Sequence, residues 1–247
     1  VRSYPELLAP RDGGLFCSAG HHFDKAKEGY WSLLQPQDRK SKNPGDADAA
    51  VLARHRWLQR GHAAGLIDAL QPWIQNTRVQ NLRDGESHVT TRTLDLGCGE
   101  GSFGPALFAD EADGYCGIDL SKRAIKLAAR NWRPVPEIGR VLSDAGSLIV
   151  AVPGEEDLIE LREQVQETGV RRSRWKMVVE EMAAAGFECV EHQTWSQQVD
   201  LEPEAIADAM AMTYRGVRYS QQSRIGTLAA MKVTLAADLI LLKRSGS

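Results

Sequence analysis

The spacing of hydrophobic and polar positions changes twice along the chain and divides it into three zones. Residues 1–34 show no sustained period and are interrupted by prolines and glycines, which is typical of short irregular structure. Between residues 46 and 75, apolar side chains recur every three or four positions, as one face of a helix requires, and Asp46 can cap the first turn. The polar stretch that follows, QNTRVQNLRDGESHVTTR, indicates a linker or a surface loop.

From Thr93 onward, strand-like and helix-like segments alternate. TLDLGCGEGSFGPALF predicts a strand, a glycine turn and a helix, and GYCGIDLSKRAIKLAARN predicts a second strand followed by a capped helix. SLIVAVPG indicates a buried strand, whereas EEDLIELREQVQE and RWKMVVEEMAAAG predict amphipathic helices, the second ended by Gly186. FECVEHQTWSQQVDL and MKVTLAADLILLKR, on either side of the helix PEAIADAMAM, fit an antiparallel edge. The alternation predicts an α/β fold with a largely parallel sheet.

The composition is that of a folded globular chain. Of 247 residues, 43% are hydrophobic and 26% are charged, which excludes disordered, collagen-like and coiled-coil proteins. No apolar run approaches the roughly 18 residues of a membrane span, and VRSYPELLAPRDGG lacks a signal-peptide core, so we expect a cytoplasmic protein. Four cysteines with no C-x-x-C pair are typical of free thiols in a reducing compartment.

Charge is distributed unevenly along the chain. The net charge is −3, yet residues 1–60 hold ten lysine and arginine residues against seven acidic ones. A basic face at one end of a neutral body suits a protein that meets RNA or DNA there, although a merely solvated basic helix has the same pattern. The candidate nucleic-acid-binding residues are Arg39, Lys40, Lys42, Arg54 and Arg56.

The most specific motif is the glycine-rich turn between Leu94 and Gly101. Glycine at alternate positions lets the backbone turn tightly at the end of a strand and approach a ligand closely. Asp119 ends the next predicted strand, where a carboxylate can accept both hydroxyls of a ribose. The spacing departs from the G-x-G-x-x-G of dinucleotide-binding proteins, and a glycine turn without a cofactor is the alternative interpretation.

The string D-x-G-C-G-E-G strongly resembles motif I of class I S-adenosylmethionine (SAM) methyltransferases, and Asp119 resembles their acidic motif II. The resemblance implies that Asp95 and Glu100 lie beside the methionine end of SAM and that Asp119 takes the ribose. The cofactor-binding set implied by the two motifs is Asp95, Gly97, Cys98, Gly99, Glu100, Gly101 and Asp119.

Motifs outside the glycine turn narrow the resemblance. CSAGHHFDKAKEGYWSLL and SKNPGDADAAVLARHRWLQRGH closely resemble the N-terminal module of the bacterial 23S rRNA (guanine-N1)-methyltransferases, which include enzymes for resistance to tylosin-type macrolides. In that family a zinc finger, C-x₂-C…C-x₃-H, precedes an A-K-x-G-Y motif and a helix with G-D…A-R…G-H. The resemblance covers nearly the whole chain and includes AVPG, LIELR and MTYRGVR (residues 212–218).

The resemblance implies a domain organisation and an activity. A degenerate zinc-finger-like RNA-recognition module at 1–45 and a helical connector at 46–92 would precede a Rossmann-like class I SAM methyltransferase domain at 93–247. The expected reaction moves a methyl group from SAM to N1 of a guanine in a 23S rRNA hairpin, and a homodimer is expected because family members form one. A non-catalytic SAM- or RNA-binding protein and a small-molecule SAM methyltransferase are the alternatives.

Three positions depart from the family pattern. The first two zinc cysteines should fall where the chain has Val1 and Tyr4, so Cys17 and His21 form an incomplete site and we expect zinc to be absent or weakly bound. Asp157 stands where relatives commonly have a histidine near SAM, and it joins the cofactor-binding set by location. The residues leave the catalytic proton acceptor unassigned, and the expected role of Trp57, Trp73 and Trp132 is packing.

A fourth departure is one of length. Only twenty-eight residues separate Asp119 from Ser147, whereas a class I sheet needs two further strand–helix units there. By resemblance, about 35–40 residues with part of the central sheet are missing near Trp132–Pro136. Three explanations are open: the sequence omits residues that the molecule contains, the gene product is degraded, or the strand SLIVAVPG has moved into the vacant slot.

Overall fold

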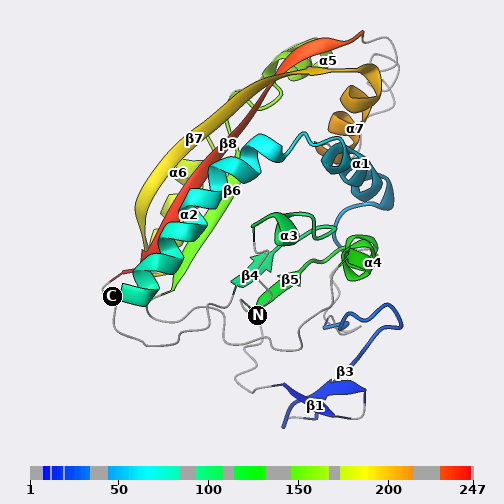
Figure 1. The fold of residues 1–247 in the computed structure, drawn as a ribbon, viewed down its shortest axis with the longest axis vertical. Helices are drawn as coiled ribbons and strands as arrows, with labels where there is room; N and C mark the ends of the chain where they lie inside the picture. Colours follow the sequence, from blue (N-terminus) through cyan, green and yellow to red (C-terminus); the bar gives the residue numbers. More distant parts are fainter. Residues whose placement is uncertain are drawn as a thin grey trace. The chain divides into compact units, whose positions relative to one another are not determined.

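The structure, a computed structural model, consists of two compact units (Figure 1). One combines Val1–Val51 with Thr90–Val141, and the other combines Leu52–Val89 with Leu142–Ser247. The predicted division at 45/46 and 92/93 is a division by function and stays a prediction. The structure describes residues 8–11, 13–18, 20–33, 44–83, 93–107, 114–131, 146–166, 173–213 and 229–245.

A small antiparallel sheet opens the first unit. Strands β1 (Ala9–Arg11), β2 (Gly14–Phe16) and β3 (His22–Asp24) lie in the order β1-β2-β3. Leu15 pairs with Phe23 across β2 and β3, and both side chains are buried. Strands of three residues are too short to show alternation, which explains why this zone shows no period in the sequence.

The same unit holds two parallel strands, each followed by a helix. Strand β4 (Thr93–Leu96) precedes helix α3 (Phe103–Leu107), and β5 (Tyr115–Ile118) precedes α4 (Lys122–Asn131). The two strands pair in register from Thr93 opposite Tyr115 to Leu96 opposite Ile118. Because both strands run in one direction, the turns that follow them meet at one edge of the sheet. The strand–turn–helix prediction for both segments is confirmed.

The second unit is built on a three-stranded antiparallel sheet. Its order is β6-β8-β7, formed by Ser147–Pro153, Met231–Arg244 and Phe187–Leu201. Figure 1 shows β7 and β8 as two long ribbons side by side, with one bulge in β7 between Cys189 and Glu191. The predicted antiparallel edge is therefore confirmed. The helices between and after these strands are α5 (Ile159–Gln166), α6 (Trp175–Ala184) and α7 (Pro203–Thr213).

Two further helices precede the sheet of the second unit in sequence. Helix α1 (Asp48–Gln59) places Trp57 in the main apolar cluster, which gathers side chains from α7, β8 and the turn before α5. Helix α2 (Ala64–Arg83) runs to Arg83 and so includes half of the stretch predicted as a linker. For residues 75–83 that prediction was wrong, because Gln and Arg are polar and still favour a helix. Residues 84–92 lie outside the described residues. None of the described helices has the length and apolar character that crossing a membrane requires.

Strand β6 lies at one edge of the antiparallel sheet, where among the described residues it pairs with β8 alone. Leu148, Ile149 and Val150 of this apolar strand are only partly buried, as a strand paired on one side allows. Strands β4 and β6 belong to different units, so the idea that SLIVAVPG fills the vacant slot stays a prediction. The segment Trp132–Pro136, to which the shortfall was assigned, lies outside the described residues.

Candidate cofactor site

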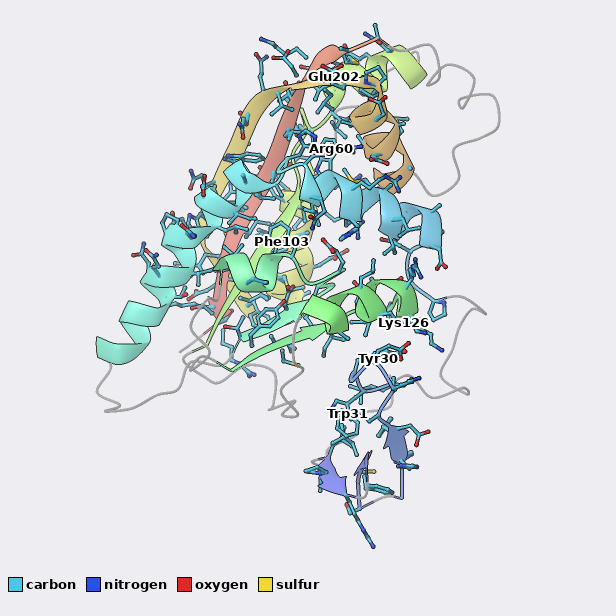
Figure 2. The ribbon with its side chains drawn as sticks, turned by 45° about the vertical axis from the view of Figure 1, so that its right-hand side comes forward. Tyr30, Trp31, Arg60, Phe103, Lys126 and Glu202 are labelled. Carbon is cyan, nitrogen blue, oxygen red and sulfur yellow. The ribbon has the colours of Figure 1, made fainter. Side chains whose placement is uncertain are left out.

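The turn after β4 has the backbone conformation of a ligand-binding glycine loop. Gly97, Gly99 and Gly101 have φ of 81°, 58° and 80°, a region that side chains other than glycine rarely adopt. The amides of Gly97 and Cys98 donate to the carbonyl oxygen of Ile118 at 2.7 and 3.1 Å, which ties the loop to the end of β5. A Cβ at Gly97 or Gly99 would meet no atom within 4 Å, so the space beside the loop is open. The loop leads into α3 at Phe103 (Figure 2).

Asp119 lies against this loop, as the sequence predicts. Its Oδ2 accepts a hydrogen bond from the amide of Gly99 at 3.0 Å, and its Oδ1 accepts one from the amide of Ser121 at 2.6 Å. Each carboxylate oxygen has a further lone pair, so both can still accept hydroxyl groups of a ligand. Leu96 and Leu120, which end β4 and follow Asp119, are each 64% exposed and add apolar surface next to the loop.

Asp95 and Tyr115 form a partly buried pair beneath the loop. The Tyr115 hydroxyl donates to Oδ2 of Asp95 at 2.7 Å. Burial raises the pKa of Asp95 despite this hydrogen bond, and the charge of Asp119 raises it further. Burial, followed by the charge of Asp95, also raises the pKa of Tyr115. The two acidic residues predicted near a cofactor are thus close enough to influence each other.

Cys98 and Glu100 point into the protein from the same loop. Burial raises the pKa of the Cys98 thiol to about 12, with further contributions from Asp95 and Asp119, so this thiol stays protonated at neutral pH. Glu100 is 1% exposed, and its Oε1 accepts a hydrogen bond from the hydroxyl of Ser102. These two residues support the loop from within, whereas Gly97, Gly99 and Asp119 border the open side.

Asp157 lies in the other unit and has a partner there. Its Oδ1 accepts a hydrogen bond from the amide of Ala236 at 3.0 Å, which holds the turn after β6 against β8. Burial raises the pKa of this carboxyl. Leu158 follows with φ of 53°, an unusual conformation for a branched side chain, and it is buried. Strain of this kind often accompanies a functional turn, and no sequence pattern pointed to Leu158.

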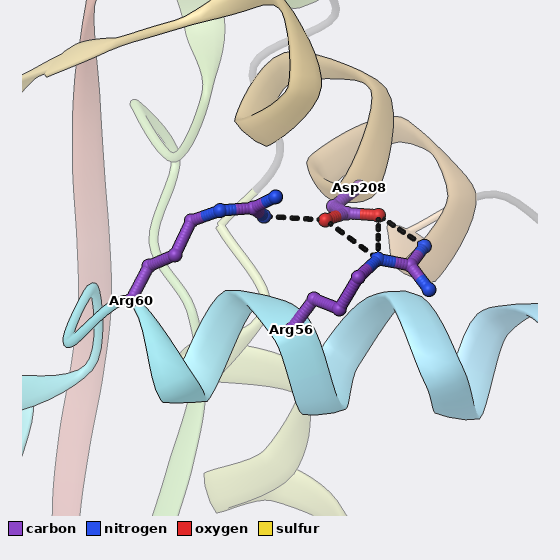
Figure 3. A network of polar contacts seen from close by, with 3 residues as sticks. All are labelled: Arg56, Arg60 and Asp208. Atoms are coloured by element: carbon purple, nitrogen blue, oxygen red, sulfur yellow. Dashed lines mark hydrogen bonds and ion pairs between the residues drawn. The ribbon is translucent and has the colours of Figure 1, made fainter.

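The predicted nucleic-acid-binding residues fall into two groups. Arg39, Lys40 and Lys42 lie outside the described residues. Arg54 and Arg56 are on α1, where the guanidinium of Arg56 binds the buried carboxylate of Asp208 on α7 together with Arg60 (Figure 3). Sequence reasoning missed Asp208, although an acidic residue between two alanines in the apolar part of PEAIADAMAM is a signal of a buried partner.

The structure brings the two predicted metal ligands, Cys17 and His21, together. Sγ of Cys17 lies 3.1 Å from Nδ1 of His21. Structural zinc is held by four ligands, and the described residues contain no group of three or more His, Cys, Asp or Glu side chains that could hold a metal. Val1 and Tyr4, at the positions of the expected cysteines, lie outside the described residues and offer neither a thiol nor an imidazole. The residues therefore do not fit a four-ligand zinc site.

Comparison with known proteins gives a match to the N-terminal segment and matches over most of the chain. The family model described as the N-terminal part of RlmA, a zinc ribbon, matches residues 5–42. A 23S rRNA (guanine(748)-N(1))-methyltransferase of Streptomyces fradiae is 27% identical over 84% of this chain and 82% of its own length. A candidate 23S rRNA (guanine-N(1)-)-methyltransferase of Micromonospora griseorubida is 28% identical over 60% of this chain and 61% of its own length, and one of Bacillus subtilis is 28% identical over 64% and 65%.

The lengths of these alignments give the size of a shortfall in the chain. The S. fradiae alignment runs over 243 positions, yet 84% of 247 residues is about 207, so about 36 positions have no residue of this chain. The other two run over 184 and 194 positions, against about 148 and 158 residues covered, and each again leaves about 36. Three alignments thus agree with the 35–40 missing residues predicted from the sequence.

Solved structures resemble the chain more distantly. A SAM-dependent methyltransferase of Thiobacillus denitrificans, in complex with S-adenosyl-L-homocysteine, is 14% identical with a TM-score of 0.33 and covers 64% of this chain and 86% of that one. The YcgJ protein of Bacillus subtilis is 13% identical with a TM-score of 0.40 and covers 70% and 100%. Both TM-scores are below 0.5, so the relationship depends on the sequence matches. Over most of its length, the chain resembles the bacterial 23S rRNA (guanine-N1)-methyltransferases.

Proposed function

We propose that the chain transfers a methyl group from SAM to N1 of a guanine in a hairpin of 23S rRNA. The observation that carries this proposal is the alignment over 84% of the chain with an enzyme named for that reaction. The geometry of the glycine loop supports the cofactor half of the proposal, and the match of residues 5–42 to the RlmA N-terminal family supports the RNA half. The substrate would be cytoplasmic, and so would the protein.

The residues of the loop fit SAM. Gly97 and Gly99 leave open space where the ligand approaches the backbone, and Asp119 offers two carboxylate oxygens to the hydroxyls of a ribose. Asp95 and Asp119 place negative charge near the loop, which complements the positive sulfonium. Bound SAM would supply an electrophilic methyl group.

The protein must then orient the base and accept a proton. N1 of guanine is a weak nucleophile whose proton leaves as the methyl group arrives, so the base edge must lie in line with the sulfonium, about 3 Å from the methyl carbon. A base in a hairpin must also be turned out of its stack and clamped. The role of Asp157 beside the cofactor belongs to this proposal, and burial has already raised the pKa of its carboxyl.

RNA docking falls to the N-terminal module at 1–45 and to the basic residues that follow it. Arg39, Lys40, Lys42, Arg54 and Arg56 would contact phosphates, because arginine and lysine supply most contacts to the backbone of nucleic acids. The bond to Asp208 fixes the Arg56 guanidinium while leaving its side chain 54% exposed. A homodimer and macrolide resistance are the further expectations attached to this function.

A second candidate function is SAM or RNA binding without catalysis. It is favoured by the shortfall of about 36 alignment positions between this chain and its relatives. Central strands of such sheets carry loops that line the substrate side, so losing them can abolish methyl transfer while the glycine loop persists.

Methyl transfer from tritiated SAM to ribosomal RNA separates the two functions. The RNA should come from a strain that lacks its own guanine-N1 methyltransferase, and an Asp119→Ala variant serves as the control without cofactor binding. Incorporation into 23S rRNA that disappears in the control supports the enzyme. SAM binding without incorporation supports the second candidate, and an absence of SAM binding contradicts both.

A further inference from the structure

The segment that joins the N-terminal module to α1 contacts the turn that carries Asp119. The hydroxyl of Ser121 donates to the carbonyl oxygen of Asp46 at 3.4 Å. The same hydroxyl accepts a hydrogen bond from the amide of Ala124 at 3.3 Å and so caps α4. Ser121 also donates its amide to Oδ1 of Asp119. Ser121 thus bonds both to Asp46, in the linker between the N-terminal module and α1, and to the Asp119 carboxylate, which is predicted to hold the ribose.

Gly45 packs directly on the backbone of this turn. A Cβ at Gly45 would meet the amide nitrogen of Ser121, would lie 2.7 Å from its Cα, and would lie 2.8 Å from the carbonyl carbon of Leu120. These atoms are main chain, so they cannot swing away as the end of a side chain can. Gly45 also has a φ of 84°, which a side chain disfavours. Two independent reasons, contact and conformation, therefore require glycine here.

A second contact fastens the N-terminal module to the same strand–helix unit. Glu28, in the AKEGY turn, accepts from Nζ of Lys126 on α4 at 2.8 Å. Hydrogen bonds between Ala26 and Tyr30 close this turn, and Figure 2 shows Tyr30 near Lys126. The hydrogen bond to Lys126 lowers the pKa of Glu28, as expected for a paired carboxylate. Both contacts lie on the β5–α4 unit, whose first turn presents Asp119.

We propose that Gly45 and Asp46 act as a positioning element for the Asp119 turn, so that the linker sets the affinity for SAM without touching it. This proposal depends on the proposed function, because it takes Asp119 to bind the cofactor. The G-D pair of the sequence pattern then has a physical role: its glycine allows the close approach and its carbonyl holds Ser121. RNA bound to the module would change the affinity for SAM through the same contact, and bound SAM would change the affinity for RNA by the same factor.

The direct test replaces Gly45 by alanine in the full chain. The new methyl group must displace the backbone of Ser121 and with it the carboxylate of Asp119. We expect the dissociation constant for S-adenosylhomocysteine, measured by calorimetry, to rise roughly ten- to a hundredfold, which corresponds to one displaced hydrogen bond of a charged group. In methyl transfer, KM for SAM should rise while kcat at saturating SAM stays within about twofold, because the chemistry itself is untouched.

Gly13→Ala is the matched control. Gly13 has a φ of 77°, close to that of Gly45, but a Cβ there would meet no atom within 4 Å. It therefore carries the same backbone strain in the same module without touching the turn, and its affinity should match that of the unchanged chain. Ser121→Ala provides a variant without steric strain: it removes the hydroxyl that holds Asp46 and caps α4, and it keeps the amide that holds Asp119. It should weaken binding in the same direction, by about two- to tenfold.

The outcomes separate this proposal from the proposed function. If the unchanged chain binds S-adenosylhomocysteine and both Gly45→Ala and Ser121→Ala bind it equally well, the positioning role is wrong and the proposed function stands. Equal weakening in Gly13→Ala and Gly45→Ala would also overturn the positioning role, since the loss would then come from strain within the module. If the unchanged chain binds no cofactor, the proposed function fails and this inference fails with it.

Discussion

The guanidinium of Arg56 donates hydrogen bonds to both carboxylate oxygens of Asp208, with Nε at 3.0 Å from Oδ1 and 3.1 Å from Oδ2 (Figure 3). Arg60 reaches Oδ2 from the next turn of the chain. The carboxylate is 5% exposed, and Ala205, Ile206, Ala209 and Met210 of the same helix belong to the apolar core. Arg56 on α1 and Arg60, which follows the last residue of α1, therefore hold α1 against α7.

We expect Asp208→Asn to lower the free energy of unfolding by about 1–3 kcal/mol at pH 7, because it removes hydrogen bonds between charged groups while the arginines keep partial hydration. Burial alone would raise the pKa of Asp208, but hydrogen bonds from Arg56 and Arg60 outweigh it and the pKa is lowered. A lowered pKa stabilises the fold above the unfolded value near 4, and this contribution is lost as the pH falls through the folded pKa.

Urea unfolding of both proteins at several pH values measures this difference. The gap between Asp208→Asn and the unchanged chain should be full at pH 7 and should shrink below about pH 4. Glu204→Gln, an exposed position on the same helix, is the control and should cost only a few tenths of a kcal/mol. A gap that stays constant across this range would contradict the ion-pair explanation.

Asp119→Ala should weaken binding of S-adenosylhomocysteine roughly 100-fold or more, since the carboxylate provides two charged acceptors. The same substitution also releases the amides of Gly99 and Ser121, so the thermal unfolding midpoint must be measured beside the affinity. Unchanged affinity in a folded variant would refute the cofactor assignment.

The glycine loop was predictable from the sequence because its chemistry is local. Gly97, Gly99 and the strand that precedes Asp119 follow from short-range spacing, and the structure adds a hydrogen bond from the amide of Gly99 to Asp119. Contacts between distant segments were not predictable: 152 residues separate Arg56 from Asp208, and 75 separate Asp46 from Ser121. No local propensity encodes such pairs, which form only when elements pack. The end of α2 was misplaced for a related reason, since Nε1 of Trp73 donates a hydrogen bond to Oε1 of Gln193, a contact with β7 that the local sequence of α2 does not show.

Thiol reactivity should distinguish the four cysteines. Cys98 is buried and its pKa is raised to about 12, so a thiol reagent at pH 8 should modify it slowly. Cys189 is exposed and should react first. The reaction is followed by mass spectrometry of peptides, with and without S-adenosylhomocysteine, which should slow Cys98 further. Modification of Cys98 as fast as Cys189 would show that the loop is open to solvent.

Zinc should be bound at less than one ion per chain after purification in zinc-containing medium, because Cys17 and His21 provide two of four ligands. Removal of metal by a chelator should leave the thermal unfolding midpoint within about 1 °C, whereas a structural zinc would contribute to folding outright. Substituting Cys17→Ser should change the thermal unfolding midpoint equally little. A full equivalent of zinc, or a fall in the midpoint with chelator, would show that ligands come from elsewhere, such as a second copy of the chain.

About 36 alignment positions of the relatives have no residue in this chain. Strand β6 has an apolar sequence suited to a sheet interior, yet the described residues give both β4 and β6 a neighbour on one side only. Unpaired apolar edges are aggregation sites, and natural proteins normally cover them. We therefore expect the protein isolated from its natural source to have an intact mass well above 27.2 kDa. A mass of 27.2 kDa would mean that the edges stay uncovered, and such a chain should aggregate and transfer no methyl group.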